Sequence, residues 1–261
     1  MAQIIAIANR KGGVGKTTTC VNLAASLAAT RRRVLVVDMD PQGNATVGCG
    51  VDSEKMEVTV CDLLLGDGDG DAATAVRPAG VGGFGVLPAN QDLTVAEVRL
   101  LSHPGRERRL KQALAPLEKE YDYALVDCPP AINMLTLNAL AAATGVLIPI
   151  QCEYLALEGL RALLETVEEI RRSVNPALRI HGILRTMYDG RTNLTKEVSG
   201  QLLDHFGEGV FRTVIPRNVR LAEAPSFGKP ALYHDKSSAG ALAYLALAGE
   251  INRREAVPAT L

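Results

Sequence analysis

The sequence lacks several features that would set it apart from ordinary soluble proteins. It contains no tryptophan, aromatic residues make up only 4% of its 261 residues, and its formal net charge at pH 7 is −1. Because the protein as a whole is not a polycation, binding to nucleic acid would need a local basic patch. The apolar stretch at residues 239–249 is too short to span a bilayer, and residues 3–8 show no signal-peptide pattern. We therefore expect a cytoplasmic protein without membrane attachment.

Disulfide bonds and a zinc site are also not expected. The five cysteines are odd in number, and no two of them show a C-x-x-C spacing. The four histidines are scattered without the spacing of a catalytic triad or a metal site. We therefore predict free thiols in a reducing compartment and interpret Cys128 as a packing residue, not as a nucleophile.

The chain does contain a regular alternation of apolar strands and helical patterns. Buried strands are predicted at residues 3–8, 33–38, 124–127, 145–150 and 179–187. Helical patterns are predicted at residues 17–30, 106–120, 135–143, 155–172, 196–206 and 239–253. This alternation predicts an α/β fold of three layers, in which a mostly parallel twisted sheet has helices on both faces. No linker or repeat divides the chain, so we expect one domain over residues 1–261.

A polar segment, residues 66–71 (GDGDGD), interrupts this alternation. Its alternating aspartates resemble a calcium-binding loop that begins at Asp67. However, Ala72 stands at the sixth position, where a glycine is needed, and Pro78 stands at the twelfth, where a glutamate is needed. We therefore predict a solvated loop.

The segment between the first predicted strand and the first helix has the pattern of a phosphate-binding loop. Glycines let backbone N–H groups turn toward phosphates, and the helix N-terminus adds a partial positive charge. Lys16 is expected to neutralise the β and γ phosphates, and the Thr17 hydroxyl to ligate Mg²⁺. The loop residues expected to bind ATP or ADP are Gly12, Gly13, Val14, Gly15, Lys16, Thr17 and Thr18.

Aspartates follow two of the predicted strands. Asp38 and Asp40 lie in V-V-D-M-D-P, and Asp127 ends the apolar run A-L-V-D, as in a Walker B strand that supports Mg²⁺ through water. Two carboxylates beside a phosphate site would repel the nucleotide unless a cation lies between them. This favours a Mg²⁺ role for at least one of them, whereas Asp40 could also simply start a turn with Pro41.

The phosphate loop departs from G-x-x-x-x-G-K-[ST] because Arg10 occupies the position of the first glycine and Lys11 follows it. The form K-G-G-V-G-K-T-T resembles the deviant Walker A motif of the ParA/MinD group of ATPases. The resemblance implies that Lys11 reaches across a nucleotide sandwich dimer to the partner's phosphates, much as an arginine finger does. It also implies that Asp38 lies near the water shell of the metal and Asp40 near the attacking water. We therefore expect Lys11, Lys16 and Asp40 to be catalytic, and Thr17, Asp38 and Asp127 to hold the metal.

Further motifs resemble the ParA/Soj branch of this group. They are DMDPQGNAT at residues 38–46, DCPP at 127–130, TMYDGRT at 186–192 and the segment 215–230. The resemblance implies that Pro216 and Asn218 lie near the adenine. It also implies that Arg191 and Arg220 hold double-stranded DNA without reading its sequence, which needs only cations aimed at phosphates. Arg217 shares this segment and is included, although exposed arginines are often merely solvated.

These resemblances imply an ATP-dependent DNA-partitioning ATPase. It would form a homodimer with ATP and Mg²⁺, associate with the nucleoid, and be released when a ParB-like partner stimulates hydrolysis. A MinD-like positioning ATPase that acts on a membrane or a protein cargo is the alternative, but it needs a C-terminal amphipathic helix. Residues 253–261 contain a proline and no aromatic residue, which disfavours it. A metabolic P-loop ligase or transferase is a third class.

Overall fold

The computed structural model describes residues 2–66 and 72–256. One eight-stranded sheet has the order β3-β4-β2-β5-β1-β6-β7-β8. Every neighbouring pair is parallel except β3 and β4, which pair antiparallel at one edge. The strands are β1 (Gln3–Ile7), β2 (Val34–Asp38), β3 (Arg77–Pro78), β4 (Gly85–Leu87), β5 (Tyr123–Asp127), β6 (Gly145–Gln151), β7 (Arg179–Tyr188) and β8 (Val210–Pro216).

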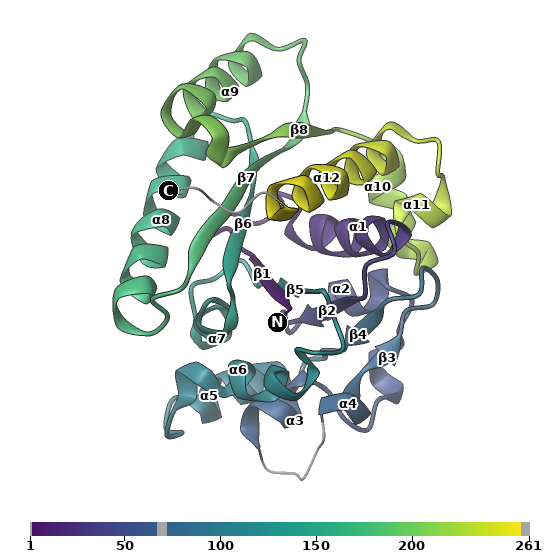
Figure 1. Ribbon diagram of the computed structural model, residues 1–261, viewed down its shortest axis with the longest axis vertical. Helices are drawn as coiled ribbons and strands as arrows, with labels where there is room; N and C mark the ends of the chain where they lie inside the picture. Colours follow the sequence, from purple (N-terminus) through teal and green to yellow (C-terminus); the bar gives the residue numbers. More distant parts are fainter. Residues whose placement is uncertain (1, 67–71, 257–261) are drawn as a thin grey trace.

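Helices cover both faces of the sheet, as the alternation predicts (Figure 1). One face carries α1, α2 and α12, and the other carries α3 and α5 to α9. The helices are α1 (Lys16–Ala29), α2 (Asn44–Gly48), α3 (Val60–Leu65), α4 (Ala72–Ala75), α5 (Leu93–Leu100), α6 (Arg109–Leu114), α7 (Met134–Ala142), α8 (Ala156–Ser173), α9 (Asn193–Phe206), α10 (Val219–Glu223), α11 (Ala231–His234) and α12 (Ala239–Ala256).

Two separate hydrophobic cores lie on the two faces of the sheet. On β1, Ile4 and Ala6 join one core, whereas Ile5 and Ile7 join the other. This division follows from the strand geometry, because successive side chains point to opposite faces. A strand that is buried on both faces must therefore be apolar throughout, which explains the continuous apolar runs of the central strands.

The central strands bring the predicted site residues to one edge of the sheet. β5 lies between β1 and β2, with Ile7 and Asp38 both in register with Asp127. The phosphate loop follows β1 directly and leads into α1. Parallel strands end at the same edge, so the loop and the two aspartates are neighbours in space.

Some predicted elements differ from the observed ones. The predicted helix at 106–120 is a short α-helix, α6, flanked by the 3₁₀ turns Arg106–Arg108 and Ala115–Leu117. Pro116 lies in the second of these turns, where it lacks the N–H that a continuing helix would need. The edge strand β8 was not predicted, since it mixes buried and exposed side chains. The predicted loop at residues 67–71 and the tail at residues 257–261 lie outside the described residues.

The long helix α12 packs into a core. Its residues Ala241, Tyr244, Leu247 and Ile251 are buried against α1 and the sheet. Among residues 2–66 and 72–256, no helix has the length and apolar character needed to cross a membrane. All five cysteine side chains are buried, and in this described part of the chain none forms a disulfide bond.

Candidate active site

The phosphate loop has a backbone that only glycine adopts without strain. Gly13 has a φ of 74° and Gly15 a φ of 86°, both in the left-handed region. A Cβ atom at Gly12 or Gly13 would meet nothing within 4 Å, so both residues face open space. The first turn of α1 has no side-chain cap, which leaves its N–H groups ready for an anion. The loop therefore has the shape and polarity of a phosphate cradle.

Lys16 lies within this loop. Its side chain is largely buried, and Nζ donates a hydrogen bond of 3.3 Å to the Lys11 carbonyl. Burial lowers the pKa of Lys16, and the nearby charge of Asp127 opposes that shift. A cation held in this way lacks full compensation for its lost hydration, so a phosphate beside it would be bound favourably.

Thr17 and Asp127 form the metal side of the site. The Thr17 hydroxyl donates a hydrogen bond of 2.7 Å to Oδ2 of Asp127. The other oxygen, Oδ1, is buried and has no hydrogen-bond partner among the described residues. An unpaired buried carboxylate oxygen is costly unless a cation or an ordered water contacts it. These residues therefore fit a Mg²⁺ ion, which prefers oxygen ligands and keeps several waters.

Asp38 lies in register with Asp127 on the adjacent strand, and both carboxyl groups are fully buried. Burial raises the pKa of Asp38 to about 6, against the lowering effect of hydrogen bonds from Thr46. Burial and the charge of Asp38 raise the pKa of Asp127. Two buried carboxylates side by side are stabilised by a divalent cation, so their pKa shifts and the open Oδ1 point to the same ligand.

Thr46 is a site residue that the sequence analysis did not single out. Its backbone N–H and its hydroxyl each donate a hydrogen bond of 2.8 Å to Oδ2 of Asp38. The N–H of Asp40 donates to Oδ1 of Asp38 at 3.1 Å. Asp38 therefore holds the loop after β2 and the first turn of α2 in place. The threonine ends the DMDPQGNAT motif, which was the available signal.

Asp40 does start a turn. Its Oδ1 accepts a hydrogen bond of 3.0 Å from the Gln42 N–H, and its carbonyl accepts one of 2.9 Å from the Gly43 N–H. The side chain is largely buried next to Asp38. The turn explains why an aspartate fits this position, and it leaves the second carboxylate oxygen available to a water molecule. A catalytic role for Asp40 stays a prediction.

The predicted adenine residues lie at the same edge of the sheet as the phosphate loop. The Thr186 hydroxyl on β7 donates a hydrogen bond of 2.8 Å to the carbonyl of Val14. Two residues further, Tyr188 is in register with Pro216 on β8. The side chain of Asn218 caps α10 by accepting the Arg220 N–H at 3.1 Å. Its amide group is left for other contacts, and adenine binding stays a prediction.

The three predicted DNA-binding arginines are exposed; Arg191 and Arg217 lie outside helices and strands, and Arg220 lies in α10. Arg191 forms an ion pair of 2.6 Å with Asp189. The charges of Arg191 and Arg217 both lower the pKa of Asp189, to about 2, with the Arg191 hydrogen bonds contributing most. Arg220 pairs with Glu223 at 2.8 Å and with Asp235 at 3.4 Å. Arg191 and Arg217 thus lie close enough to act on the same carboxylate, and Arg220 lies three residues after Arg217, in α10.

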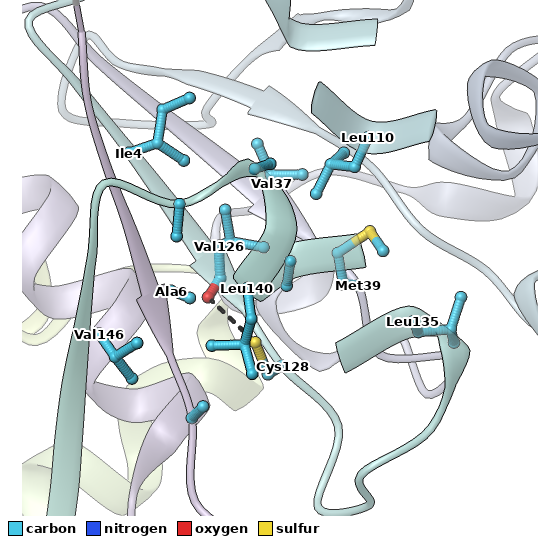
Figure 2. Close-up of a cluster of buried hydrophobic side chains, with 14 of the residues drawn as sticks. Ile4, Ala6, Val37, Met39, Leu110, Val126, Cys128, Leu135, Leu140 and Val146 are labelled. Atoms are coloured by element: carbon cyan, nitrogen blue, oxygen red, sulfur yellow. Dashed lines mark hydrogen bonds between the residues drawn. The ribbon is translucent and has the colours of Figure 1, made fainter. Parts of the chain in front are cut away.

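Cys128 follows Asp127 but points into the core. Figure 2 shows its sulfur among apolar side chains that include Leu140. The thiol donates a weak hydrogen bond of 3.8 Å to the Val126 carbonyl, and burial raises its pKa. A buried, protonated thiol is a poor nucleophile, which agrees with the interpretation of Cys128 as a packing residue.

The cavity beside the phosphate loop is small. It measures about 280 Å³ and is lined by Thr17, Thr18, Asn22, Asn44 and Lys229, among others. Ligand pockets usually measure roughly 300–1,000 Å³. Its lining includes Thr17 and Thr18 but none of the glycines of the phosphate loop.

The buried carboxylates should make stability depend on pH in the metal-free protein. The folded-state pKa of Asp38 is raised, so its contribution is fully present below its unfolded pKa of about 3.9 and is lost as pH rises through about 6. The loss amounts to about 3 kcal/mol at pH 7. Burial and the charge of Asp38 likewise raise the pKa of Asp127, so replacing this second carboxylate by a neutral amide should remove its own loss. We expect urea unfolding without Mg²⁺ to find Asp127→Asn more stable than the wild type at pH 7, with a smaller difference at pH 4.5.

The exposed Asp204→Asn on α9 serves as the control for this measurement and should follow the wild-type pH profile. Adding Mg²⁺ and ADP should stabilise the wild type more than Asp127→Asn, because only the wild type presents both carboxylates to the ion. Identical pH profiles for the wild type and Asp127→Asn would contradict the electrostatic account of the pair.

Proteins of known family are similar to this chain over most of its length. A family model described as an AAA domain matches residues 2–180. The chromosome-partitioning ATPase Soj of Thermus thermophilus is 55% identical over 96% of this chain and 95% of its own. The chromosome partitioning protein ParA of Myxococcus xanthus is 49% identical over 98% of this chain and 89% of its own.

A solved structure is similar over nearly the same length. The cobyrinic acid a,c-diamide synthase from Mycobacterium smegmatis, with bound ADP and magnesium, is 39% identical and has a TM-score of 0.85. The similarity covers 98% of this chain and 96% of that one. With the phosphate loop, the paired aspartates and these relatives in agreement, the chain belongs to the ParA/Soj family of chromosome-partitioning ATPases.

Proposed function

We propose that residues 1–261 act as one ATP-dependent DNA-partitioning switch. ATP and Mg²⁺ bind at the phosphate loop, two protomers close over two nucleotides, and the dimer holds double-stranded DNA until a ParB-like partner stimulates hydrolysis. The observation that carries the dimer is the position of Lys11. Its side chain is half exposed and lies outside its own phosphate cradle, where Lys16 is already present. It therefore does not occupy its own cradle, and we infer that it serves the phosphates of another protomer.

Each residue of the site has a defined task in this proposal. Mg²⁺ would be held through Thr17 and, by way of water, through Asp38 and Asp127, and it supplies charge neutralisation for the phosphates. The similar solved structure, which contains ADP and magnesium, supports this choice of cofactors. Lys16 binds the protomer's own phosphates, and Lys11 binds those of the partner. Asp40 orients the attacking water, because hydrolysis of this kind depends mostly on positioning and electrostatics.

Closure of two protomers would cover the exposed side of the phosphate loop. The open side of the loop at Gly12 and Gly13 is where a second copy would complete the enclosure. It would also double the arginine surface formed by Arg191, Arg217 and Arg220. Two of these arginines are paired with carboxylates of their own chain, so DNA phosphates must compete with those pairs. DNA binding by a single protomer is then weak, and dimerisation raises the affinity because two arginine surfaces bind the same DNA together.

The direct test is DNA retention with ATP, ADP and no nucleotide. We expect retention only with ATP, and Arg220→Glu should weaken it strongly while still forming the ATP-dependent dimer. Each lost phosphate contact makes the negative slope of log affinity against log salt shallower by about 0.9. The dimer of this variant lacks two such contacts, so its slope should be shallower by roughly two units. Gel shifts over a salt series, with light scattering for the dimer, measure both.

Arg161→Glu is the matched control, because Arg161 is also exposed and paired with a glutamate but lies on α8. It should bind DNA as the wild type does. Unchanged DNA retention in Arg220→Glu would remove Arg220 from the DNA surface, and retention that ignores the nucleotide would contradict the switch.

A metabolic ATPase is the second candidate function. One similar solved structure is named as a synthase for a small-molecule reaction, which is the observation in its favour. Turnover that depends on a small-molecule acceptor and is indifferent to DNA would select it. The MinD-like alternative would show itself as ATP-dependent sedimentation with liposomes. The burial of the α12 apolar residues in the core offers it no support.

A further inference from the structure

Lys11 has a specific partner within its own protomer. Its Nζ lies 2.5 Å from Oε2 of Glu153, which is located in the turn between β6 and α8. Both side chains are 43% exposed. The ammonium group therefore contacts a carboxylate that is 142 positions away in the sequence.

Both ends of this ion pair are held by buried or backbone contacts. Asn9 accepts the Lys11 N–H at 3.0 Å, and its own amide donates to the Pro149 carbonyl of β6 at 2.7 Å. Glu153 donates its N–H to the Gln151 carbonyl at 2.8 Å, and its carbonyl accepts the Ala156 N–H, at the start of α8, at 3.0 Å. The same strand thus anchors the backbone of the phosphate loop and presents the carboxylate to Lys11. The fold builds this contact between two fixed turns.

The ion pair between Lys11 and Glu153 is strong enough to hold the lysine side chain and weak enough for a phosphate to displace the glutamate. Exposed ion pairs shift an equilibrium by roughly 1.4-fold to fivefold. A nucleotide phosphate with more than one charge is a stronger partner for an ammonium group than one carboxylate. Because Lys11 cannot contact both at once, a phosphate from a second protomer would have to displace Glu153.

We propose that Glu153 is a positioning residue for Lys11, which it holds within the protomer until the phosphates of a partner replace it. The proposal rests on the sandwich dimer of the proposed function. Closing one dimer breaks two such pairs, so Glu153 should weaken dimerisation by about twofold to thirtyfold. Tyr154 and Leu155 follow Glu153 directly and are 84% and 60% exposed. In this proposal, a second copy of the chain covers these two side chains when its bound phosphates replace Glu153 as the partner of Lys11.

The contact can be tested with a zero-length carbodiimide cross-linker, which joins an amine only to a carboxylate in direct contact. In nucleotide-free protein we expect a Lys11–Glu153 cross-link within one protomer. Mixing ¹⁴N- and ¹⁵N-labelled protein and analysing peptides by mass spectrometry distinguishes it from a link between protomers. A non-hydrolysable ATP analogue with Mg²⁺ should reduce its yield several-fold, because Lys11 leaves Glu153 in the dimer.

The second measurement is the dissociation constant of the dimer with the same analogue. Glu153→Gln should tighten the dimer by about twofold to thirtyfold, and the gain should shrink at high salt, where the ion pair of the wild type is screened. Glu169→Gln, near the other end of α8, removes the same charge from an exposed position and should change nothing.

The outcomes separate the two proposals. A wild type that forms no dimer with the analogue contradicts the proposed function. A wild type that dimerises while its cross-link yield stays constant, or a Glu153→Gln dimer that is no tighter than the wild type, overturns the role of Glu153.

Discussion

Lys11→Ala should retain nucleotide binding, lose the ATP-dependent dimer, and lower stimulated ATP turnover by about 10³–10⁵-fold, the range found for cations supplied across an interface. The structural reason is the division of labour between two lysines. Lys16 lies buried in the cradle, whereas the Lys11 side chain is half exposed and pairs with Glu153. Fluorescent ATP binding, light scattering and phosphate release measure the three properties separately.

Gly12→Val gives an independent version of this test. A Cβ at Gly12 would meet nothing within 4 Å inside the protomer, so a valine there should fold normally. It would stand where the second copy must approach, and we expect it to block the dimer while ATP still binds. Lys16→Ala is the contrasting control, because it should lose nucleotide binding itself. A normal ATP-dependent dimer in Lys11→Ala or Gly12→Val would refute the sandwich arrangement.

Asp40→Ala should trap the ATP-bound dimer on DNA and lower turnover by about 10²–10⁴-fold, the range for a group that handles a proton or orients water. Its carboxylate lies next to Asp38 but outside the pair formed by Asp38 and Asp127. Metal and nucleotide binding should therefore survive. The half-life of the DNA complex after a challenge with competitor DNA, and the rate of phosphate release, are the measurements.

The turn at Asp40 calls for a second variant. Asp40→Asn keeps an oxygen that can accept the Gln42 N–H but removes the negative charge, so it separates the turn from the chemistry. Both variants should be slow if the carboxylate orients the water. If Asp40→Asn turns over as fast as the wild type, the turn alone is the function of this residue, and Asp40 leaves the mechanism.

The sequence predicted the parts of the fold that follow from local pattern. The apolar runs at β1, β2, β5 and β6 are buried strands, and all of them pair in parallel. Edge strand β8 escaped prediction because its side chains mix buried and exposed positions. The helix predicted at residues 106–120 is interrupted, since Pro116 lies in its last turn and local periodicity is a weak guide beside such breaks.

Some residues of the candidate site could likewise be recognised in the sequence, and others only in the structure. The glycines of the phosphate loop, Lys16 and the aspartates that end strands are recognisable because their chemistry depends on local spacing along the chain. Thr46 and Glu153 carry no such signal by themselves. Thr46 becomes a site residue only because the loop after β2 folds back onto Asp38, and Glu153 only because β6 lies beside β1.

The amino-acid sequence alone shows a phosphate loop with a second lysine, Lys11, and strand-ending aspartates that can serve a metal ion. These follow from residue type and spacing, which the chain carries wherever it folds. The partner of the Lys11 ammonium group can be found only in the folded chain, since that partner is 142 positions away. The folded chain also places Asp38 and Asp127 side by side and buries both of them fully. Register and burial are set by the packing of the whole sheet. Because burial and mutual repulsion disfavour two ionised carboxylates, a bound cation stabilises them.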